Sequence, residues 1–325
     1  MTEDTYDLLV IGGGPAGLTA ALYAHRGGLR VGMIGGDRPG GQVMSHHRVE
    51  NYPGFPGGVP GAQLMMGWLK QVMDEVGALP VPETIVRVDF ASPVKTAFTA
   101  AGEYKAHAVI VASGSRPKRL DLPGAVDFEG KGVFYCASCD GPLLRTMQDR
   151  RAAVVGGGDT AFHTAISLIP HAEWVTLITR GPAPRAQPVL VNRLLCCEGA
   201  RVLVCHAVRS IIGDACLTGL ILKDTETGQE TVLNVGALFV GIGQDPATEF
   251  LQGAVELDAE GFIVTDALLR TSAPGVFAAG DVRVTPLRQI VTAAADGALA
   301  ANSAIRYLEG RQHEVPSGNS ASRPG

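Results

Sequence analysis

The chain has 325 residues, which is enough for two domains that each bury a core of their own. Apolar residues make up 46% of the chain and charged residues 18%, as in ordinary globular proteins, and a net charge of −5 without a long basic run gives no support for nucleic-acid binding. No apolar run approaches the ~18 residues of a membrane span, and the acidic start is unlike a secretory signal, so we expect a cytoplasmic protein with no transmembrane segment.

A glycine-rich turn follows the first predicted strand, residues 7–11. The run from Gly12 through Gly14 to Gly17 has the spacing Gly-x-Gly-x-x-Gly and leads into a helical pattern. Gly12 would make the turn, Gly14 would let the backbone approach a pyrophosphate, and Gly17 would let the helix pack on the strand. The helix N-terminus would then face the anion. This stretch therefore predicts a dinucleotide site.

The region after this turn carries a long loop. The second predicted strand, residues 31–35, ends without the acidic residue that commonly binds a ribose, and Asp37 comes two residues later. Residues 39–56 are rich in glycine and proline, and long loops of this kind usually serve a function. His46 and His47 in this loop could contact a cofactor, but we favour solvated histidines. The pattern then predicts a helix over 61–77, strands near 83–90 and 94–99, and an apolar strand over 109–114 whose end could touch a cofactor.

Two cysteines separated by two residues come next. Cys136 and Cys139 can close a small disulfide and cycle between dithiol and disulfide. Asp140, directly after them, is placed to give or take the proton that this exchange requires. Zinc would need two more ligands, and no second Cys-x-x-Cys exists, so we interpret the pair as redox-active and expect no metal site. We expect the other four cysteines to be buried and inert, namely Cys196, Cys197, Cys205 and Cys216. A less favoured alternative is that the adjacent Cys196 and Cys197 form a second exchange site.

The opening pattern then returns. A predicted strand at 151–155 is followed by Gly156, Gly158 and Ala161 in the spacing Gly-x-Gly-x-x-Ala, and the offset from Gly12 to Gly156 is 144 residues. This repeat predicts two dinucleotide-binding domains, the second inserted into the first. The following strand, 174–179, ends without an acid and is followed by Arg180 and Arg185. These arginines suit a 2′-phosphate, although solvated arginines in a Gly/Pro loop remain an alternative.

The last third of the chain closes the first domain. Residues 201–240 are rich in predicted strands. Residues 275–281 read as a strand that ends in Gly280-Asp281, which places a carboxylate where ligands bind in parallel sheets. A helix is predicted over 289–309, and the polar tail 311–325 is expected to be disordered.

Taken together, these motifs resemble the low-molecular-weight thioredoxin reductases over residues 6–310. The stretches that carry the resemblance are Gly12–Gly17, Gly40–Gln42 with Asn51–Gly54, Cys136–Asp140, Val155–Ala161, Gly280-Asp281 and Arg288-Gln289. The resemblance implies an α/β fold of two Rossmann-like, three-layer domains. An FAD-binding domain would comprise 1–116 plus 248–310, and a pyridine-nucleotide-type domain over 117–247 would carry the cysteine pair.

The resemblance also implies the residue roles. FAD would be bound by Gly12, Gly14, Pro15, Ala16, Gly17, Gly41, Gln42, Asn51, Ala112, Gly114, Gly280, Asp281, Arg288, Gln289 and Ile290. Asp281 would lie near the ribityl-phosphate region, and Arg288 to Ile290 near the isoalloxazine. Cys139 would be the sulfur nearer the flavin, Cys136 would attack an external disulfide, and Asp140 would be the acid/base. A second nucleotide would be bound by Gly156, Gly158, Asp159, Thr160, Ala161, Arg180 and Arg185. The family pattern further implies a homodimer and a domain rotation that exposes the cysteines alternately to flavin and partner.

Two departures from the family pattern bear on function. The family's His-Arg-Arg-x-x-x-Arg phosphate site is here Thr179-Arg180-Gly181-Pro-Ala-Pro-Arg185, and each lost charged contact should remove roughly 1.5–3 kcal/mol of binding free energy. The aromatic pair that follows Gly141 in the family is here Pro142-Leu143. NADPH as donor and thioredoxin as acceptor are therefore less expected than FAD and the disulfide.

Three functions follow from this pattern. The favoured one is an FAD-dependent thiol-disulfide oxidoreductase without efficient NADPH use, whose redox partner is a second flavin (two FAD per chain), a ferredoxin or a dithiol. It would act on a thiol/disulfide protein or small dithiol. The first alternative is an NADPH-dependent thioredoxin-disulfide reductase. The second is a non-catalytic flavin redox sensor, against which the complete Cys-x-x-Cys-Asp argues, since a sensor needs no acid/base.

Overall fold

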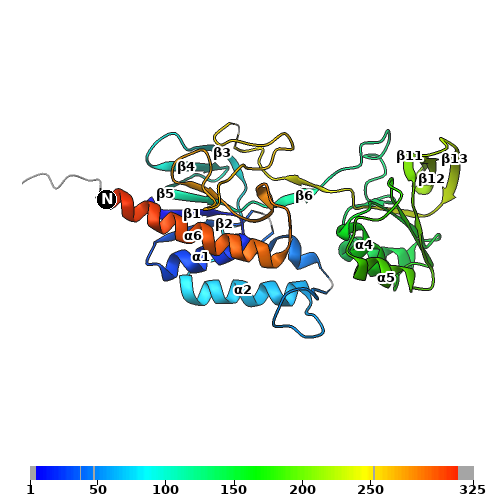
Figure 1. Ribbon diagram of the computed structural model, residues 1–325, viewed down its shortest axis with the longest axis horizontal. Helices are drawn as coiled ribbons and strands as arrows, with labels where there is room; N and C mark the ends of the chain where they lie inside the picture. Colours follow the sequence, from blue (N-terminus) through cyan, green and yellow to red (C-terminus); the bar gives the residue numbers. More distant parts are fainter. Residues whose placement is uncertain (1–4, 37, 47, 252, 314–325) are drawn as a thin grey trace, which may run out of the picture. The chain divides into compact units, whose positions relative to one another are not determined.

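The chain folds as two compact units, the second inserted into the first. The computed structural model describes residues 5–36, 38–46, 48–251 and 253–313, so Asp37, His47 and the tail from 314 onwards lie outside the described residues. One unit comprises Met1–Ser115 with Pro246–Gly325, and the other comprises Arg116–Asp245. In Figure 1 the first unit contains both the N-terminal part of the chain, in blue, and the C-terminal part, in orange and red. The middle of the chain, mostly green, forms the second unit.

The first unit is built on a six-stranded sheet. Its strands run in the order β2 (Val31–Ile34), β1 (Thr5–Ile11), β5 (Glu103–Val111), β4 (Lys95–Thr99) and β3 (Ile85–Asp89), with β16 (Val276–Ala278) also pairing β5. The pairs β1–β2, β1–β5 and β5–β16 are parallel, so their carboxyl ends meet at one edge of the sheet. The sequence predicted a strand over 109–114, which overlaps β5 only at Val109–Val111, the part that pairs with β16. The earlier part, Glu103–Ala106, pairs with the antiparallel β4.

Alternate residues of β1 face two different cores. Leu8 and Val10 pack with the helices, whereas Leu9 and Ile11 pack with Leu251, Val255 and Ile263 on the other face. The described α-helices of this unit lie on one side of its sheet in Figure 1, namely α1 (Pro15–Arg26), α2 (Gly61–Val76) and α6 (Ile290–His313). Helices α1 and α6 pack so closely that a Cβ atom at Gly297 would collide with the carbonyl oxygen of Ala16.

Helix α6 is longer than the sequence predicts. It begins at Ile290 and continues to His313, whereas the sequence predicted a helix over 289–309. Tyr307 and Leu308 pack against the core just before the predicted end of the helix. Gly310 does not end it, because one glycine costs only about 1 kcal/mol in a helix.

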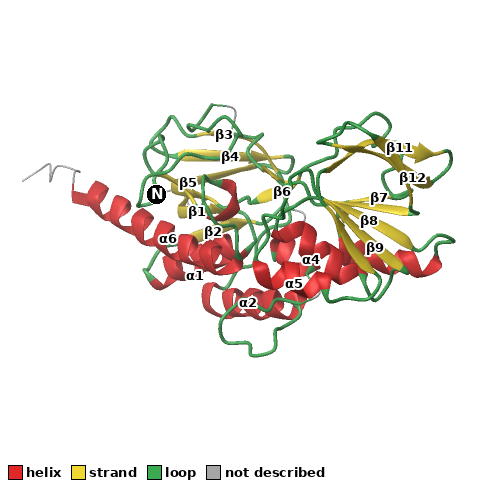
Figure 2. Cartoon of the chain, turned by 45° about the vertical axis from the view of Figure 1, so that its right-hand side comes forward, coloured by secondary structure: helices red, strands yellow, loops and turns green. Residues whose placement is uncertain are grey.

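The second unit has a five-stranded parallel sheet and a small antiparallel sheet. The parallel strands run in the order β10 (Ala200–Leu203), β9 (Trp174–Ile178), β8 (Arg151–Val155), β14 (Ala237–Val240) and β7 (Val133–Phe134). The antiparallel strands are β11 (His206–Gly213), β12 (Leu217–Asp224) and β13 (Glu230–Asn234). Figure 2 shows helices α4 (Asp159–Leu168) and α5 (Pro188–Leu195) on one face of β7–β9 and the antiparallel sheet on the other. Each unit is therefore a three-layer, Rossmann-like α/β fold.

Two short strands connect the units, β6 (Ser115–Pro117) and β15 (Gln244–Pro246), and they pair with each other. Among the described helices, none combines the length and apolar character needed to cross a membrane. The described residues also contain no group of three or more histidine, cysteine or acidic side chains that could hold a metal ion.

Candidate active site

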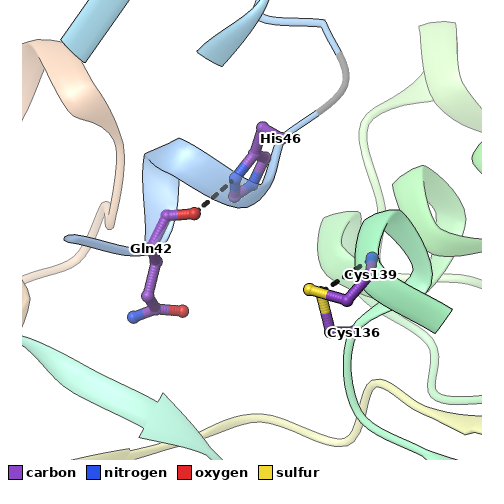
Figure 3. The surroundings of a disulfide bond; sticks show 4 residues. All are labelled: Gln42, His46, Cys136 and Cys139. Carbon is purple, nitrogen blue, oxygen red and sulfur yellow. Dashed lines mark hydrogen bonds between the residues drawn. A yellow bond between two sulfur atoms is a disulfide. The ribbon is translucent and has the colours of Figure 1, made fainter. Parts of the chain in front are cut away.

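Cys136 and Cys139 form a disulfide in the second unit (Figure 3). Their Cα atoms lie 5.3 Å apart, because the chain leaves β7 and makes one helical turn, α3 (Ala137–Asp140), between them. Cys136 caps this turn in an extended conformation, and its Sγ atom accepts a hydrogen bond of 3.2 Å from the backbone N–H of Cys139. Cys136 is half-buried and Cys139 is exposed, so a partner disulfide can reach the pair from solvent.

Asp140 completes the same turn. Burial raises the pKa of its carboxyl above the ordinary value, and a hydrogen bond with the Cys136 backbone acts in the opposite direction. The carboxyl therefore keeps its proton to a higher pH than an ordinary aspartate. A group that can hold and release a proton next to two sulfur atoms has the property that thiol-disulfide exchange requires.

The residue before Cys136 is held by a network that sequence reasoning missed. The hydroxyl oxygen of Tyr135 accepts a hydrogen bond of 3.1 Å from the backbone N–H of Leu120. Burial raises the pKa of Tyr135, and the nearby Glu129 raises it further. Arg119 Nη1 in turn donates to both carboxylate oxygens of Glu129, at 3.0 and 3.1 Å. This network fixes the strand end from which the disulfide turn starts, and no local pattern reveals a partnership across 15 residues.

The remaining cysteines differ from expectation. The expectation that they are buried is wrong, because Cys196 and Cys216 are exposed, while Cys197 and Cys205 are partly exposed. They lie at the end of α5, after β10 and in the β11–β12 turn, where elements end at the surface. The thiol of Cys197 donates to the carbonyl oxygen of Arg193 at 3.2 Å. Within the described chain, the only disulfide is the one between Cys136 and Cys139.

The first glycine turn lies at the carboxyl end of β1. Gly12 has a φ of +128°, and a Cβ atom there would collide with the carbonyl oxygen of Ala112. A Cβ atom at Gly17 would collide with the carbonyl oxygen of Gly12. Gly14 is different, because its Cβ would meet only Gly41, at 3.9 Å. Helix α1 has no side-chain cap and no acidic residue in its first turn. Its free N–H groups and the open space at Gly14 fit a phosphate group.

Other predicted contact residues surround this turn. Pro15 and Ala16 begin α1, and Gly114, with a φ of +73°, has open space around it. The loop carrying Gly41 closes on the turn, since Gly40 N–H donates to Gly13 O at 2.8 Å. Gln42 Nε2 donates to the carbonyl oxygen of Ser115 at 2.8 Å. The exposed His46 ring makes a 3.1 Å hydrogen bond with the carbonyl oxygen of Gln42, as Figure 3 shows.

Asp281 lies on the short turn η3 (Gly280–Val282), directly after β16. Gly280 has a φ of +77°, and its Cβ would be 2.9 Å from the Cβ of Ala16, so the turn lies against the start of α1. The Asp281 carboxylate makes no hydrogen bond with any described residue. Burial raises its pKa to about 6; the charge of Arg288 opposes this rise and that of Asp296 adds to it.

The segment before α6 supplies two more polar groups. The Arg288 guanidinium lies over the Phe262 ring, 4.1 Å from its centroid, and its Nε atom is buried without a hydrogen-bond partner. Gln289 Oε1 accepts a 2.9 Å hydrogen bond from Asn51 Nδ2, and Ile290 begins α6 and packs on the core. An unpaired carboxylate, an unpaired buried N–H and an open glycine turn lie in one unit. These residues fit a flavin nucleotide, which carries hydroxyl, phosphate and ring acceptor groups.

The second glycine turn follows β8 in the other unit. A Cβ atom at Gly156 would collide with the carbonyl oxygen of Gly241, whereas Gly158 has open space. Ala161 is buried beneath the turn and Thr160 is exposed. Both oxygens of Asp159 accept hydrogen bonds from Gln187, at 2.8 Å from the backbone N and 2.6 Å from Nε2.

The loop after β9 folds back onto this turn. Arg185 N–H donates to Gly157 O at 2.7 Å, and Thr225 Oγ1 donates to the carbonyl oxygen of Arg180 at 3.2 Å. The side chains of Arg180 and Arg185 are exposed and make no hydrogen bond or ion pair with the residues that the structure describes. Two cations are therefore available on a fixed loop beside the second turn.

The fold and the disulfide define a class of protein, the flavin-dependent disulfide oxidoreductases. Residues 6–297 match the family model of the pyridine nucleotide-disulphide oxidoreductases. A curated thioredoxin reductase of Peptoclostridium litorale is 41% identical over 313 residues, covering 94% of this chain and 98% of that protein. The chain belongs to the low-molecular-weight thioredoxin reductase family, and it is an FAD-dependent disulfide oxidoreductase.

Two solved structures extend the comparison. The thioredoxin reductase of Lactococcus lactis is 33% identical with a TM-score of 0.89, covering 94% of this chain and 99% of that one. A ferredoxin-flavin thioredoxin reductase from Clostridium acetobutylicum is 26% identical with a TM-score of 0.51, again covering 94% and 99%.

Proposed function

We propose that the protein passes electrons between FAD bound at the first glycine turn and the Cys136–Cys139 disulfide, and that NADPH is an inefficient electron donor for it. The proposal about NADPH rests on the composition and contacts of the loop after β9. Its first residue, Thr179, is buried with 6% of its surface exposed. Its Oγ1 faces Gly157, since a Cβ there would come within 2.5 Å of it. Thr179 therefore supplies no cation.

The same loop lacks a second cation. Gly181 has no side chain, and its carbonyl oxygen accepts the N–H of Cys205 at 3.0 Å, which holds the backbone in place. Arg180 and Arg185 remain as the available charges. Relative to the family's phosphate site, two charge-assisted contacts are missing, each worth roughly 1.5–3 kcal/mol. The affinity for a 2′-phosphate should fall by about tenfold to hundredfold per contact.

The cysteine chemistry follows from the turn geometry. FAD, when bound, supplies a carrier for one electron pair. In the reduced pair, the Cys136 thiolate attacks a partner disulfide, and one partner sulfur leaves as a thiolate that takes a proton. The Cys139 thiolate then attacks the Cys136 sulfur, which re-forms the Cys136–Cys139 disulfide and releases the second partner sulfur. Asp140 holds the proton that moves between sulfur and solvent in these steps.

The acceptor is a thiol/disulfide protein or a small dithiol. The curated relatives are named thioredoxin reductases, which favours a thioredoxin-like protein. Next to the disulfide such a partner would meet Pro142 and Leu143, and the Leu143 side chain is 49% exposed. We also propose a homodimer, as the family pattern implies, which light scattering of the purified holoprotein would test.

Three donors are compatible with a weak NADPH site. A ferredoxin is one, since a relative of the same fold is named a ferredoxin-flavin thioredoxin reductase. A second flavin at the open Gly158 turn is another, and a dithiol that reverses the electron flow is the third. A flavin count after denaturation decides the second: one flavin per chain excludes it.

The second candidate function is an NADPH-dependent thioredoxin-disulfide reductase. The unpaired side chains of Arg180 and Arg185 favour it, because two free guanidinium groups beside an open dinucleotide turn can bind a 2′-phosphate. A non-catalytic flavin sensor is the third candidate, and absence of turnover with every donor–acceptor pair would support it.

An anaerobic titration with NADPH, read at the flavin absorbance, separates the candidates. We expect the wild-type flavin to bleach only at a large excess of NADPH. The variant Gly181→Arg, which restores one cation, should bleach at a lower concentration. The variant Ala215→Arg, which adds a cation at the exposed β11–β12 turn of the same unit, is the matched control and should behave as wild type. Complete bleaching of wild type by one equivalent of NADPH would overturn the proposal and establish the second candidate.

A further inference from the structure

We propose that Asp296 is a positioning residue of the flavin site, which anchors the turn carrying Asp281 through the backbone of Gly280 and the side chain of Arg283. Asp296 lies on α6, outside every motif identified in the sequence. The inference rests on flavin occupying the first glycine turn. It concerns how the chain holds its own residues ready for the flavin.

Asp296 accepts three hydrogen bonds. Its Oδ2 atom accepts the backbone N–H of Gly280 at 3.0 Å and Arg283 Nε at 2.7 Å, while its Oδ1 atom accepts Arg283 Nη2 at 3.1 Å. The side chain of Asp296 is only 14% exposed and that of Arg283 18% exposed. This is a bidentate, mostly buried ion pair, and such pairs fix the relative geometry of their side chains strongly.

Arg283 uses its remaining donors within the same region. Its Nη1 atom donates to the carbonyl oxygen of Val284 at 2.9 Å and to Thr265 Oγ1 at 3.3 Å. The guanidinium therefore links α6 to the segment that follows η3 and to the neighbouring loop. A lysine could not make all of these contacts, because its ammonium lacks the planar fork.

Asp281 is held on both sides by this arrangement. Before it, the Gly280 N–H is bound to Asp296; after it, the carbonyl oxygen of Val282 accepts the N–H of Ile263 at 3.0 Å. The Asp281 carboxylate itself has no hydrogen bond to the described residues. Its backbone is fixed and its side chain is free to accept a donor from a ligand, which is the property of a preorganised binding group. Asp296 supplies the fixed point.

The alternative is that the ion pair only stabilises the fold. A structural ion pair would change the melting temperature of the flavin-free and flavin-bound proteins equally. A positioning residue would also reduce the rise in melting temperature that FAD produces, because that rise reports the affinity of the folded state for FAD. The dissociation constant of FAD and this rise are therefore the informative readouts.

The test compares Asp296→Asn, Arg283→Lys and a control, Asp74→Asn. Asp74 forms an ion pair with Lys70 on helix α2, and both side chains are more than half exposed, so the control removes an ion pair away from the turn. We expect Asp296→Asn to weaken FAD binding by roughly tenfold to hundredfold. We expect Arg283→Lys to weaken it several-fold, and the control to leave it unchanged.

Arg283→Lys keeps the charge, so it decides the question if Asp296→Asn does not fold. Unchanged FAD affinity in Arg283→Lys and in a folded Asp296→Asn, with equal losses of melting temperature with and without FAD, would overturn the proposal. Because the readout is FAD binding, its failure is distinct from failure of the proposed function, which the NADPH titration reports. A protein that binds no FAD at all, wild type included, would contradict the flavin site itself.

Discussion

The backbone N–H of Cys139 donates a hydrogen bond of 3.2 Å to the Sγ atom of Cys136, and no corresponding donor to the Cys139 sulfur is present among the described residues. The two sulfurs of the disulfide therefore have different surroundings. A hydrogen bond to sulfur favours the thiolate over the thiol, so the asymmetry assigns the more stable thiolate to Cys136. This agrees with the role proposed above for Cys136, as the sulfur that attacks a partner disulfide.

The first prediction concerns the thiol pKa values of the reduced pair. In Cys139→Ser, which retains the amide donor, the remaining Cys136 thiol should have a lower pKa than the remaining Cys139 thiol in Cys136→Ser. The measurement is the rate of alkylation by iodoacetamide as a function of pH in each variant. Equal midpoints, or a lower midpoint for Cys139, would remove the hydrogen bond as the cause of the asymmetry.

The second prediction concerns Asp140. Replacing it with asparagine removes the proton carrier and should slow thiol-disulfide exchange by about 10²–10⁴. FAD content should not change. Single-turnover exchange with a small disulfide is the measurement, and Asp214→Asn, at an exposed turn of the same unit, is the control. Because burial raises the pKa of Asp140, the wild-type rate should change at a pH above the ordinary aspartate range. An unchanged rate in Asp140→Asn would exclude the acid/base role.

The third prediction concerns the first glycine turn. Gly12→Ala places a Cβ against the Ala112 carbonyl oxygen at a φ of +128°, so the turn must distort and FAD should be lost on purification. Gly67→Ala is the matched control, because Gly67 is exposed in helix α2 with nothing within 4 Å of the added atom. The control should retain FAD and gain up to about 1 kcal/mol of unfolding free energy. Normal FAD binding by Gly12→Ala would contradict the assignment of the first glycine turn as the flavin site.

The fourth prediction concerns Asp281. Burial raises its pKa from the ordinary 3.8 to about 6, so ionisation costs the folded state stability as pH rises through this range. The shift corresponds to about 3 kcal/mol. Asp281→Asn should therefore make the flavin-free protein more stable than wild type at pH 8, with little difference at pH 4. Chemical denaturation at the two pH values measures this.

The same variant should bind FAD more weakly, because the amide replaces a carboxylate that can accept a strong hydrogen bond from the ligand. In wild type, FAD affinity should fall as the pH drops below about 6, where Asp281 takes up a proton. If Asp281→Asn binds FAD as tightly as wild type at every pH, the Asp281 carboxylate does not contact FAD.

The parts of the fold that the sequence predicts are those with local signatures. The glycine turns at Gly12 and Gly156 can be predicted from the sequence, because only glycine fits where a Cβ atom would collide with a carbonyl oxygen. The turn also fixes the spacing of its glycines, which gives a recognisable motif. Cys136, Cys139 and Asp140 lie within one helical turn, so their proximity also follows from spacing alone.

The parts that sequence reasoning misses depend on distant partners. The Tyr135–Leu120 and Asn51–Gln289 hydrogen bonds join residues 15 and 238 positions apart, and only the packed fold brings them together. Asp296 belongs to no sequence motif, although its side chain accepts the N–H of Gly280. The expectation of buried cysteines also failed because burial depends on the fold. Cysteine is usually buried, but these four cysteines lie at the ends of helices and strands.

The most direct test of the account is anaerobic stopped-flow reduction by an excess of dithiothreitol, with the flavin absorbance as signal, in wild type and in Cys139→Ser. Electrons should reach the flavin only through the Cys136–Cys139 pair. The wild-type flavin should bleach, whereas Cys139→Ser should retain its FAD and stay oxidised over the same time. Bleaching of both proteins at the same rate would contradict it.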